Sequence, residues 1–231
     1  MTIESIIKAD QELLLFLNGS DSLYLDNLMT AITSTWTWIP AAVALLYVLF
    51  KNNSPRNFLI ILLMLALTIA LADGFSSGFC KPYFSRWRPT NDPSLMYLVD
   101  TVDNYRGGSY GFISSHAANT FSVFLFCALL IRDRLFVWLT LAWSLLNCYS
   151  RIYLGVHYPL DILCGLLCGA VVGLLVYRLC AFLFSRFSSD DKSNFISDQY
   201  TSTGYSRDDV NVCSFVLILC MLYASVSAVV C

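Results

Sequence analysis

The sequence contains little charge and almost no histidine. Charged residues make up 13% of the 231 residues, the formal net charge is -2, and only His116 and His157 are histidine. A nearly neutral chain without a basic tract offers no electrostatic support for nucleic-acid binding, so we set that class of function aside. Because histidine is so rare here, the sequence around each of the two is the most informative part of the chain.

Apolar residues dominate what remains. The chain is 57% hydrophobic with a mean hydropathy of +0.64, above the roughly half-apolar composition of soluble domains. A membrane-crossing helix needs about 20 mostly apolar residues, and six runs approach that length. We expect an all-α integral membrane bundle of about six transmembrane helices in a single domain, 1–231, with spans near 34–50, 58–75, 117–131, 135–149, 162–184 and 212–230.

Two polar stretches flank this core. The first 30 residues begin with an amphipathic segment carrying Glu4, Lys8, Asp10 and Glu12, which lacks the uncharged core of a secretory signal. We expect this segment to lie along the membrane surface. The polar stretch 185–211 is expected to be a flexible cytoplasmic connection.

Counting the spans places 76–116 and 150–161 on one side of the membrane and 51–57, 132–134 and 185–211 on the other. The second side is rich in lysine and arginine, which favours the cytoplasm. The first side would then face outward, and we expect the periplasmic or outer face of a bacterial inner membrane. The long segment 76–116 is expected to be an extracytoplasmic active-site loop, with a short surface helix starting at Asp92-Pro93.

Nine cysteines raise the question of disulfides or zinc. Eight of them lie in or beside apolar runs, where cysteine acts as a small hydrophobe. Cys164 and Cys168 are four residues apart, but no histidine or second cysteine pair accompanies them. We therefore expect no metal site.

Three short motifs carry lysine, arginine, histidine and aspartate in a fixed order. They are Lys81-x6-Arg88-Pro89, Ser114-Ser115-His116 and Ser150-Arg151-x5-His157-x3-Asp161. Together they resemble the signature of the type 2 phosphatidic acid phosphatase (PAP2) superfamily of membrane lipid phosphatases. The middle motif departs from the family's usual Pro-Ser-Gly-His, because Ile113 and Ser115 replace its proline and glycine. The resemblance implies a six-helix bundle with the core that these phosphatases share with vanadium haloperoxidases.

The resemblance also implies a role for each motif residue. His157 would be the nucleophile, with Asp161 holding its other ring nitrogen, and His116 would protonate the leaving oxygen. A four-residue separation at the start of a helix puts His157 and Asp161 on one face, which agrees with that pairing. The family pattern requires no metal or cofactor. The expected ligands of the phosphate are Lys81, Arg88, Ser114, Ser115 and Arg151.

Taken one by one, these residues have ordinary structural explanations, such as anchoring span ends or capping helices; the ordered set of three motifs favours catalysis. Asp73 is expected to have a structural role, pairing with a nearby cation. Arg86 shares the loop but not the motif position, and both a phosphate contact and a structural role stay open for it.

The expected substrate is a lipid phosphate, with membrane lipids as the surroundings and no obligate protein partner. Polyprenyl diphosphate is favoured, followed by lipid A and phosphatidylglycerol phosphate. Two other functions stay open: a phosphotransferase using the same residues, and a non-catalytic lipid-phosphate binder or transporter.

Overall fold

The computed structural model describes residues 2–187 and 198–230, and most of them are helical. The main helices are α1 (Ile3–Leu17), α2 (Leu23–Thr33), α3 (Thr35–Lys51), α4 (Pro55–Asp73), α6 (Ser115–Ile131), α7 (Arg134–Tyr153), α8 (Pro159–Phe187) and α9 (Arg207–Val230). Each of the six expected spans overlaps one of these helices. Several begin where a side chain accepts a hydrogen bond from the first turn, as Thr2, Ser22, Ser54 and Asp133 do.

The helix after Pro55 is longer than the sequence predicted. It continues from α4 through a π-helical turn, Gly74–Cys80, into the short α5, Lys81–Phe84. Phe75, Phe79 and Tyr83 stack successively along it, with ring centroids 5.7 and 5.5 Å apart. The prediction that a loop begins at residue 76 was therefore wrong: the aromatic stack carries the helix past Gly74 and Gly78, and the loop begins at Ser85.

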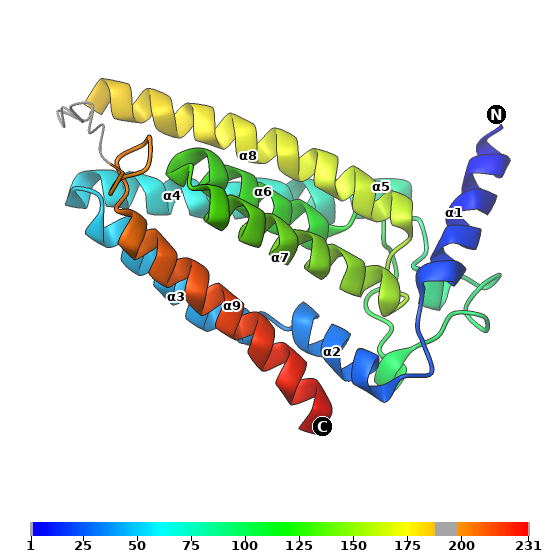
Figure 1. Cartoon of the computed structure of the whole chain (residues 1–231). Coiled ribbons are helices and arrows are strands. Elements are labelled where there is room, and N and C mark those ends of the chain that lie inside the picture. The colour runs from blue at the N-terminus through cyan, green and yellow to red at the C-terminus, as the bar shows by residue number, and fades with distance from the viewer. Residues whose placement is uncertain (1, 188–197, 231) are drawn as a thin grey trace.

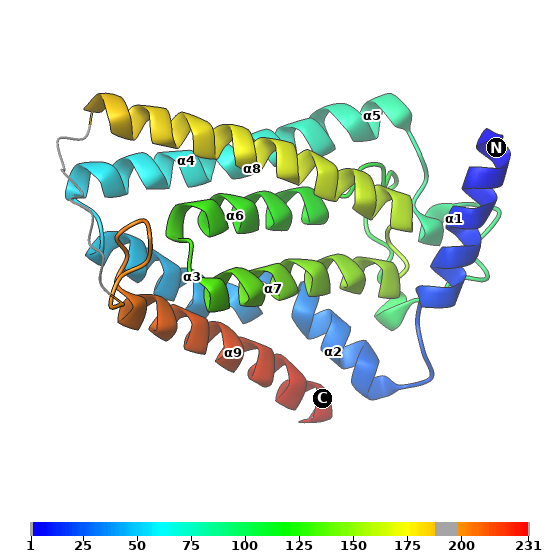
Figure 2. The ribbon, with the colours of Figure 1, turned by 45° about the horizontal axis from the view of Figure 1, so that its top comes forward.

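Helix α6 lies at the centre of the bundle, in contact with α4, α7 and α8, as Figure 2 shows. Helices α3 and α9 pack against each other on the far side of α7, with α2 beside α9. The closest packing joins α8 to α6. A β-carbon on Gly165, Gly169 or Gly173 would lie only 2.6–2.8 Å from a backbone carbonyl oxygen of α6 or its N-cap. The three oxygens belong to Ser114, Ala118 and Ser122. Small residues four apart let two helices approach this closely.

The outer surface of the bundle is apolar. Leu167, Val171 and Leu175 on α8 have exposed fractions of 61, 57 and 62%, which suits contact with lipid chains. Within the described residues, three helical stretches are long and apolar enough to cross a membrane: Pro55–Phe84, Pro159–Phe187 and Arg207–Val229. The bent pair α2 and α3 makes a fourth if it counts as one span. Helix α6 is apolar but, at 17 residues, shorter.

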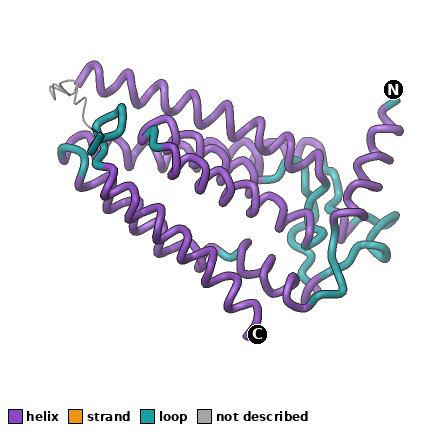
Figure 3. Tube along the Cα trace, in the orientation of Figure 1, coloured by secondary structure: helices purple, strands orange, loops and turns teal. Residues whose placement is uncertain are grey.

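Loops gather at the two ends of the bundle (Figures 1 and 3). One end holds the turns near 52–54, 132–133 and 198–206. The other holds the chain from Ser85 to Ser114 and the turn between α7 and α8, where α1 lies across the ends of the long helices (Figure 1). All three motifs are at this second end.

Two further predictions about the polar segments needed correction. The stretch after Asp92 forms turns and not a regular helix, because Leu95 and Val99 are drawn into a buried cluster with Leu14 of α1. The connection expected over 185–211 is shorter: α8 runs to Phe187 and α9 starts at Arg207. Residues 188–197 lie outside the described residues, and after them Tyr205 is buried and receives a hydrogen bond from Asn53.

Candidate active site

His157 and Asp161 form the centre of the site. His157 ends the turn after α7 and Asp161 lies in the first turn of α8, so the side chains meet, with His157 Nδ1 3.4 Å from Asp161 Oδ2. The same oxygen accepts a hydrogen bond from the Tyr158 amide at 3.1 Å. His157 is 2% exposed and Asp161 is fully buried. The expected pairing of these two residues is present in the structure.

Arg88 determines which nitrogen of His157 carries the proton. Its Nη1 lies 3.4 Å from His157 Nε2 and also donates to the carbonyl oxygen of Val156, while its Nε donates to the carbonyl oxygen of Tyr110. A guanidinium only donates hydrogen bonds, so Nε2 is the acceptor and the proton is on Nδ1, facing Asp161. In this tautomer the lone pair is on Nε2, and it can attack a phosphorus atom once the phosphate takes over the hydrogen bond from Arg88.

The cations around His157 keep it neutral. Burial is the largest cause lowering the pKa of His157 well below its ordinary value of 6.5, and the charges of Arg88, Arg151 and Lys81 act in the same direction. Arg88 lies beside His157, and His116 lines one cavity together with Arg151.

Lys81 is held by two hydroxyl groups. Its Nζ donates to Ser115 Oγ at 2.6 Å and to Ser77 Oγ at 3.2 Å. Ser77 in turn donates to Asp73 Oδ1 at 3.1 Å. Asp73 therefore has the structural role expected from the sequence, since it lies behind the hydroxyl groups that fix the lysine.

The two serines of the middle motif have different surroundings. Ser114 is fully buried, and its hydroxyl accepts the Ala117 amide at 3.4 Å as the N-cap of α6. Its amide donates to the carbonyl oxygen of Asp161 at 3.0 Å, which ties the start of α6 to α8. Ser114 thus positions α6, while Ser115, the residue that departs from the family pattern, contacts the lysine.

Arg151 and His116 face a cavity of about 650 Å³. Arg151 is 4% exposed and donates to Thr33 Oγ1 at 2.6 Å and to the Tyr105 hydroxyl at 3.0 Å, while its Nε has no hydrogen-bond partner. The rest of the wall is mostly polar. It comes from the junction of α2 and α3 and from the loop after 101, and includes Thr30, Ser34, Thr35, Asp103, Asn104 and Arg106.

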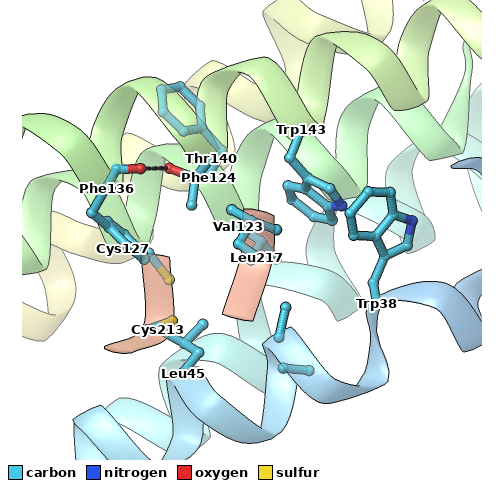
Figure 4. A pocket seen from close by; sticks show the side chains of 12 residues that line it. Trp38, Leu45, Val123, Phe124, Cys127, Phe136, Thr140, Trp143, Cys213 and Leu217 are labelled. Carbon is cyan, nitrogen blue, oxygen red and sulfur yellow. Dashed lines mark hydrogen bonds between the residues drawn. The ribbon is translucent and has the colours of Figure 1, made fainter. Parts of the chain in front are cut away.

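A second cavity lies inside the bundle between α3, α6, α7 and α9 (Figure 4). It measures about 130 Å³, and Trp38 and Trp143 meet edge to face at one side of it. The only hydroxyl in its wall, that of Thr140, already donates to the carbonyl oxygen of Phe136. This cavity offers no charged group to a phosphate, whereas the polar cavity presents His116, Arg151 and Arg106. His157, Arg88 and Lys81 lie outside the lining of the polar cavity.

The sequence left the role of Arg86 open and did not identify Asp10, Thr33 or Tyr105 as residues of the site. Arg86 Nη1 donates to Asp161 Oδ1 at 2.8 Å, and Asp10 of α1 binds the other end of that guanidinium. Thr33 and Tyr105 hold Arg151 from segments far from the motifs. No spacing rule links these positions to the motifs. In residues 2–187 and 198–230, no cluster of three or more His, Cys, Asp or Glu side chains is arranged to hold a metal ion.

Comparison with known proteins gives the same picture over most of the chain. The family model described as PAP2 superfamily matches residues 57–185. Lipid A 4'-phosphatases of Porphyromonas gingivalis and Bacteroides thetaiotaomicron are 37 and 38% identical over 80 and 81% of this chain, and over 78 and 84% of their own lengths. An undecaprenyl-diphosphatase of Sulfolobus acidocaldarius is 29% identical over 76% of this chain and 81% of its own.

One solved structure shares the fold. The crystal structure of a transmembrane PAP2 type phosphatidylglycerolphosphate phosphatase from Bacillus subtilis superposes with a TM-score of 0.57 at 22% identity. The match covers 80% of this chain and 89% of the other. At that identity the likeness supports the helical arrangement alone.

Proposed function

Because this chain belongs to the PAP2 superfamily and is a membrane lipid phosphatase of that type, we propose that it hydrolyses a phosphate monoester on the sugar headgroup of lipid A or a similar glycolipid. The observation that carries the proposal is the cavity beside His116. Its lining includes hydroxyl, amide and charged side chains besides Arg151, and such groups can form hydrogen bonds with the hydroxyl groups of a sugar. The relatives at 37 and 38% identity are lipid A 4'-phosphatases.

In the proposed reaction, the phosphate occupies the space between His157 Nε2 and the cations. Arg88, Arg151 and Lys81 bind its non-bridging oxygens, where charge must be stabilised during transfer. The Nε of Arg151 is buried and has no hydrogen-bond partner in the structure, so it keeps a donor that an anion can use. The amide of Ser115 and that of His116, in the first turn of α6, add backbone donors to the same anion.

The Nε2 lone pair attacks phosphorus, and the bond to the sugar oxygen breaks. His116 donates a proton to that oxygen, since an alkoxide is a poor leaving group at neutral pH. Burial, followed by the charge of Arg151, lowers the pKa of His116 to about 4, so this step requires that the negative charge of the bound phosphate raise that pKa and allow the imidazolium to form. Asp161 accepts a hydrogen bond from the protonated Nδ1 of His157 and stabilises the positive charge that develops on the ring. Water then attacks the phosphohistidine, with His116 accepting its proton, and inorganic phosphate leaves.

Polyprenyl diphosphate is the second candidate. The undecaprenyl-diphosphatase of Sulfolobus acidocaldarius is similar to this chain over most of both lengths, at 29% identity. Attack on the terminal phosphorus of a diphosphate expels a lipid monophosphate, which is a more stable leaving group than an alkoxide and depends less on protonation by His116. The sequence alone favoured this substrate, and we now rank it second because the lipid A relatives are more similar.

A substrate panel tests the ranking. Phosphate release by the detergent-purified protein is measured on lipid A, undecaprenyl diphosphate and phosphatidylglycerol phosphate, with H157Q as the inactive control. We expect the highest kcat/KM with lipid A and loss of the 4'-phosphate in its product. A higher kcat/KM with undecaprenyl diphosphate would reverse the ranking. Adding a second lipid as acceptor distinguishes hydrolysis from phosphotransfer.

We also propose that the site faces away from the cytoplasm in a bacterial inner membrane. Lys51, Arg56, Arg132 and Arg186 gather toward the opposite end of the bundle, which favours the cytoplasmic side. Two exposed serines test this orientation when each is replaced by cysteine: Ser94 lies at the site end of the bundle and Ser202 at the other end. An impermeant thiol reagent applied to intact cells should label S94C and not S202C; the reverse pattern would invert the orientation.

A further inference from the structure

Helix α1 brings a buried carboxylate to the active site from outside the three motifs. Asp10 is 4% exposed, although the neighbouring side chains on α1, such as Lys8 and Glu12, are largely exposed. Its Oδ1 accepts the amide of Leu160, in the first turn of α8, at 2.9 Å. Its Oδ2 accepts Arg86 Nη2 at 2.7 Å. A surface helix has no need to bury a charge, so this arrangement calls for a function.

Arg86 joins that carboxylate to the catalytic one. Its Nη1 donates to Asp161 Oδ1 at 2.8 Å while its Nη2 is bound to Asp10. The guanidinium carbon lies 4.0 Å from the centre of the Tyr158 ring, which holds the plane of the group. Two carboxylates and a ring thus occupy the guanidinium, which leaves it badly placed to bind a substrate phosphate.

We propose that Arg86 and Asp10 are positioning residues, which act through Asp161 to keep His157 in its nucleophilic form. The order of contacts is Asp10, Arg86, Asp161, His157. This proposal rests on the phosphatase activity proposed above but is independent of which lipid is hydrolysed.

The two oxygens of Asp161 explain why this support matters. Oδ2 faces His157 Nδ1 and the Tyr158 amide, and Oδ1 faces Arg86. Asp161 is fully buried, and a buried carboxylate without a counter-charge is driven to take up a proton. A protonated Asp161 would no longer accept the Nδ1 hydrogen, and the imidazole proton could move to Nε2. The lone pair that attacks phosphorus would then be lost.

Other charges near Asp161 cannot replace Arg86. Arg88 is directed toward His157 Nε2 and backbone carbonyl groups, and Lys81 toward two serines. The titratable groups whose charges act on Asp161 or are affected by it are Arg86, Arg88, Lys81, His157, Tyr158 and Cys164. Among them only Arg86 makes an ion pair with Oδ1.

The test compares R86Q, R86K and D10N with the wild-type chain, and K8Q serves as the matched control on an exposed charge of α1. The readouts are kcat, KM, inhibition by inorganic phosphate and the pH profile, on whichever lipid phosphate the wild type hydrolyses. We expect R86Q to lower kcat by about 10²-fold or more, by analogy with loss of the correct histidine tautomer in a triad. KM and the phosphate inhibition constant should stay within about threefold, because the phosphate ligands are untouched.

The pH profile separates positioning from simple structural support. In R86Q the acid limb of kcat should move to higher pH, because Asp161 has lost the cation that favours its ionised form. R86K should recover part of the activity, and D10N should shift the limb in the same direction with a smaller loss. K8Q should match the wild type.

Two outcomes would overturn the proposal. If R86Q weakened phosphate inhibition while kcat was retained, Arg86 would be a phosphate ligand. If R86Q and D10N lost kcat with an unmoved acid limb, the pair would serve folding alone. Should R86Q fail to fold, R86K and D10N still decide between these outcomes. A chain inactive on every lipid phosphate would refute the proposed function and not this coupling.

Discussion

Gly111 lies directly against the Asp161 carboxylate. A β-carbon on Gly111 would be 3.0 Å from Asp161 Oδ2 and 3.5 Å from His157 Nδ1, in the space between the paired side chains and Arg88. The Gly111 amide donates to the carbonyl oxygen of Arg86 at 2.9 Å, which fixes the backbone there. The loop before α6 therefore forms one wall of the catalytic pair, and that wall leaves no room for a side chain.

This contact predicts that G111A damages catalysis more than folding. We expect kcat to fall by at least about tenfold, since small displacements of reacting groups are costly, while the thermal unfolding temperature changes little at this loop. G108A is the matched control, because a β-carbon on Gly108 would meet nothing within 4 Å. Equal kcat values for G111A and G108A would show that the pair tolerates displacement.

The proposed role of His116 predicts a dependence on the leaving group. H116N should lower kcat/KM on a lipid monophosphate by about 10²- to 10⁴-fold, the usual contribution of a general acid. On an aryl phosphate such as p-nitrophenyl phosphate, whose leaving group needs no proton, the loss should be much smaller. H157Q should abolish turnover of both substrates. A uniform loss on both substrates in H116N would assign His116 to phosphate binding instead.

The surroundings of His157 predict where activity is lost in acid. Burial, followed by the charges of Arg88 and Arg151, lowers the pKa of His157 well below 6.5. The neutral ring is the nucleophile, so a lowered pKa keeps it active as the pH falls through 6.5. The acid limb of kcat/KM due to His157 should lie well below pH 6.5. Profiles on two substrates whose phosphates titrate differently separate the limbs of the enzyme, which stay fixed, from those of the substrate, and a fixed limb that moves in R86Q belongs to Asp161. A fixed limb at or above pH 6.5 that R86Q leaves unmoved would contradict the prediction.

Local signals in the sequence predicted the helical bundle, whereas the common site of the three motifs was implied by the resemblance to the PAP2 superfamily. Apolar runs of span length identified the helices, and the four-residue spacing of His157 and Asp161 placed them on one face. The roles of Asp10, Thr33 and Tyr105 depend on where α1, α2 and the loop after 101 cross the end of the bundle. Such long-range contacts leave no periodic trace in one sequence, and neither does the continuation of α4 past residue 76.

The hydroxyl groups around Lys81 predict that their removal weakens binding of the phosphate substrate. Ser115 and Ser77 both accept from its Nζ, so S77A/S115G removes both tethers and restores the family's usual glycine at 115. A hydrogen bond to a charged group contributes about 1.5–3 kcal/mol, and the phosphate can recover part of it. We expect KM to rise by about tenfold with kcat nearly kept, and S94A to match the wild type in steady-state kinetics. A large loss of kcat at unchanged KM would place Lys81 in transition-state stabilisation alone.

The contact between α6 and α8 links stability to the site. Helix α6 begins at Ser115 and His116, and α8 carries Asp161 in its first turn, so the approach of the two helices sets the distance between the acid and the catalytic pair. A β-carbon on Gly169 would lie 2.6 Å from the carbonyl oxygen of Ala118, and backbone atoms cannot rotate away as a side chain can.

G169A should therefore push the helices apart, at a cost of about 1–3 kcal/mol for overpacking, and reduce kcat as well. G78A is the control: no atom lies within 4 Å of a β-carbon there, and alanine favours a helix over glycine by about 1 kcal/mol. Thermal unfolding in detergent, followed by intrinsic fluorescence, should show a lower midpoint for G169A and an unchanged or higher one for G78A. The prediction fails if G169A has the same unfolding midpoint and the same kcat as the wild type. Close packing between α6 and α8 would then not be the cause of the alignment of His116 with His157.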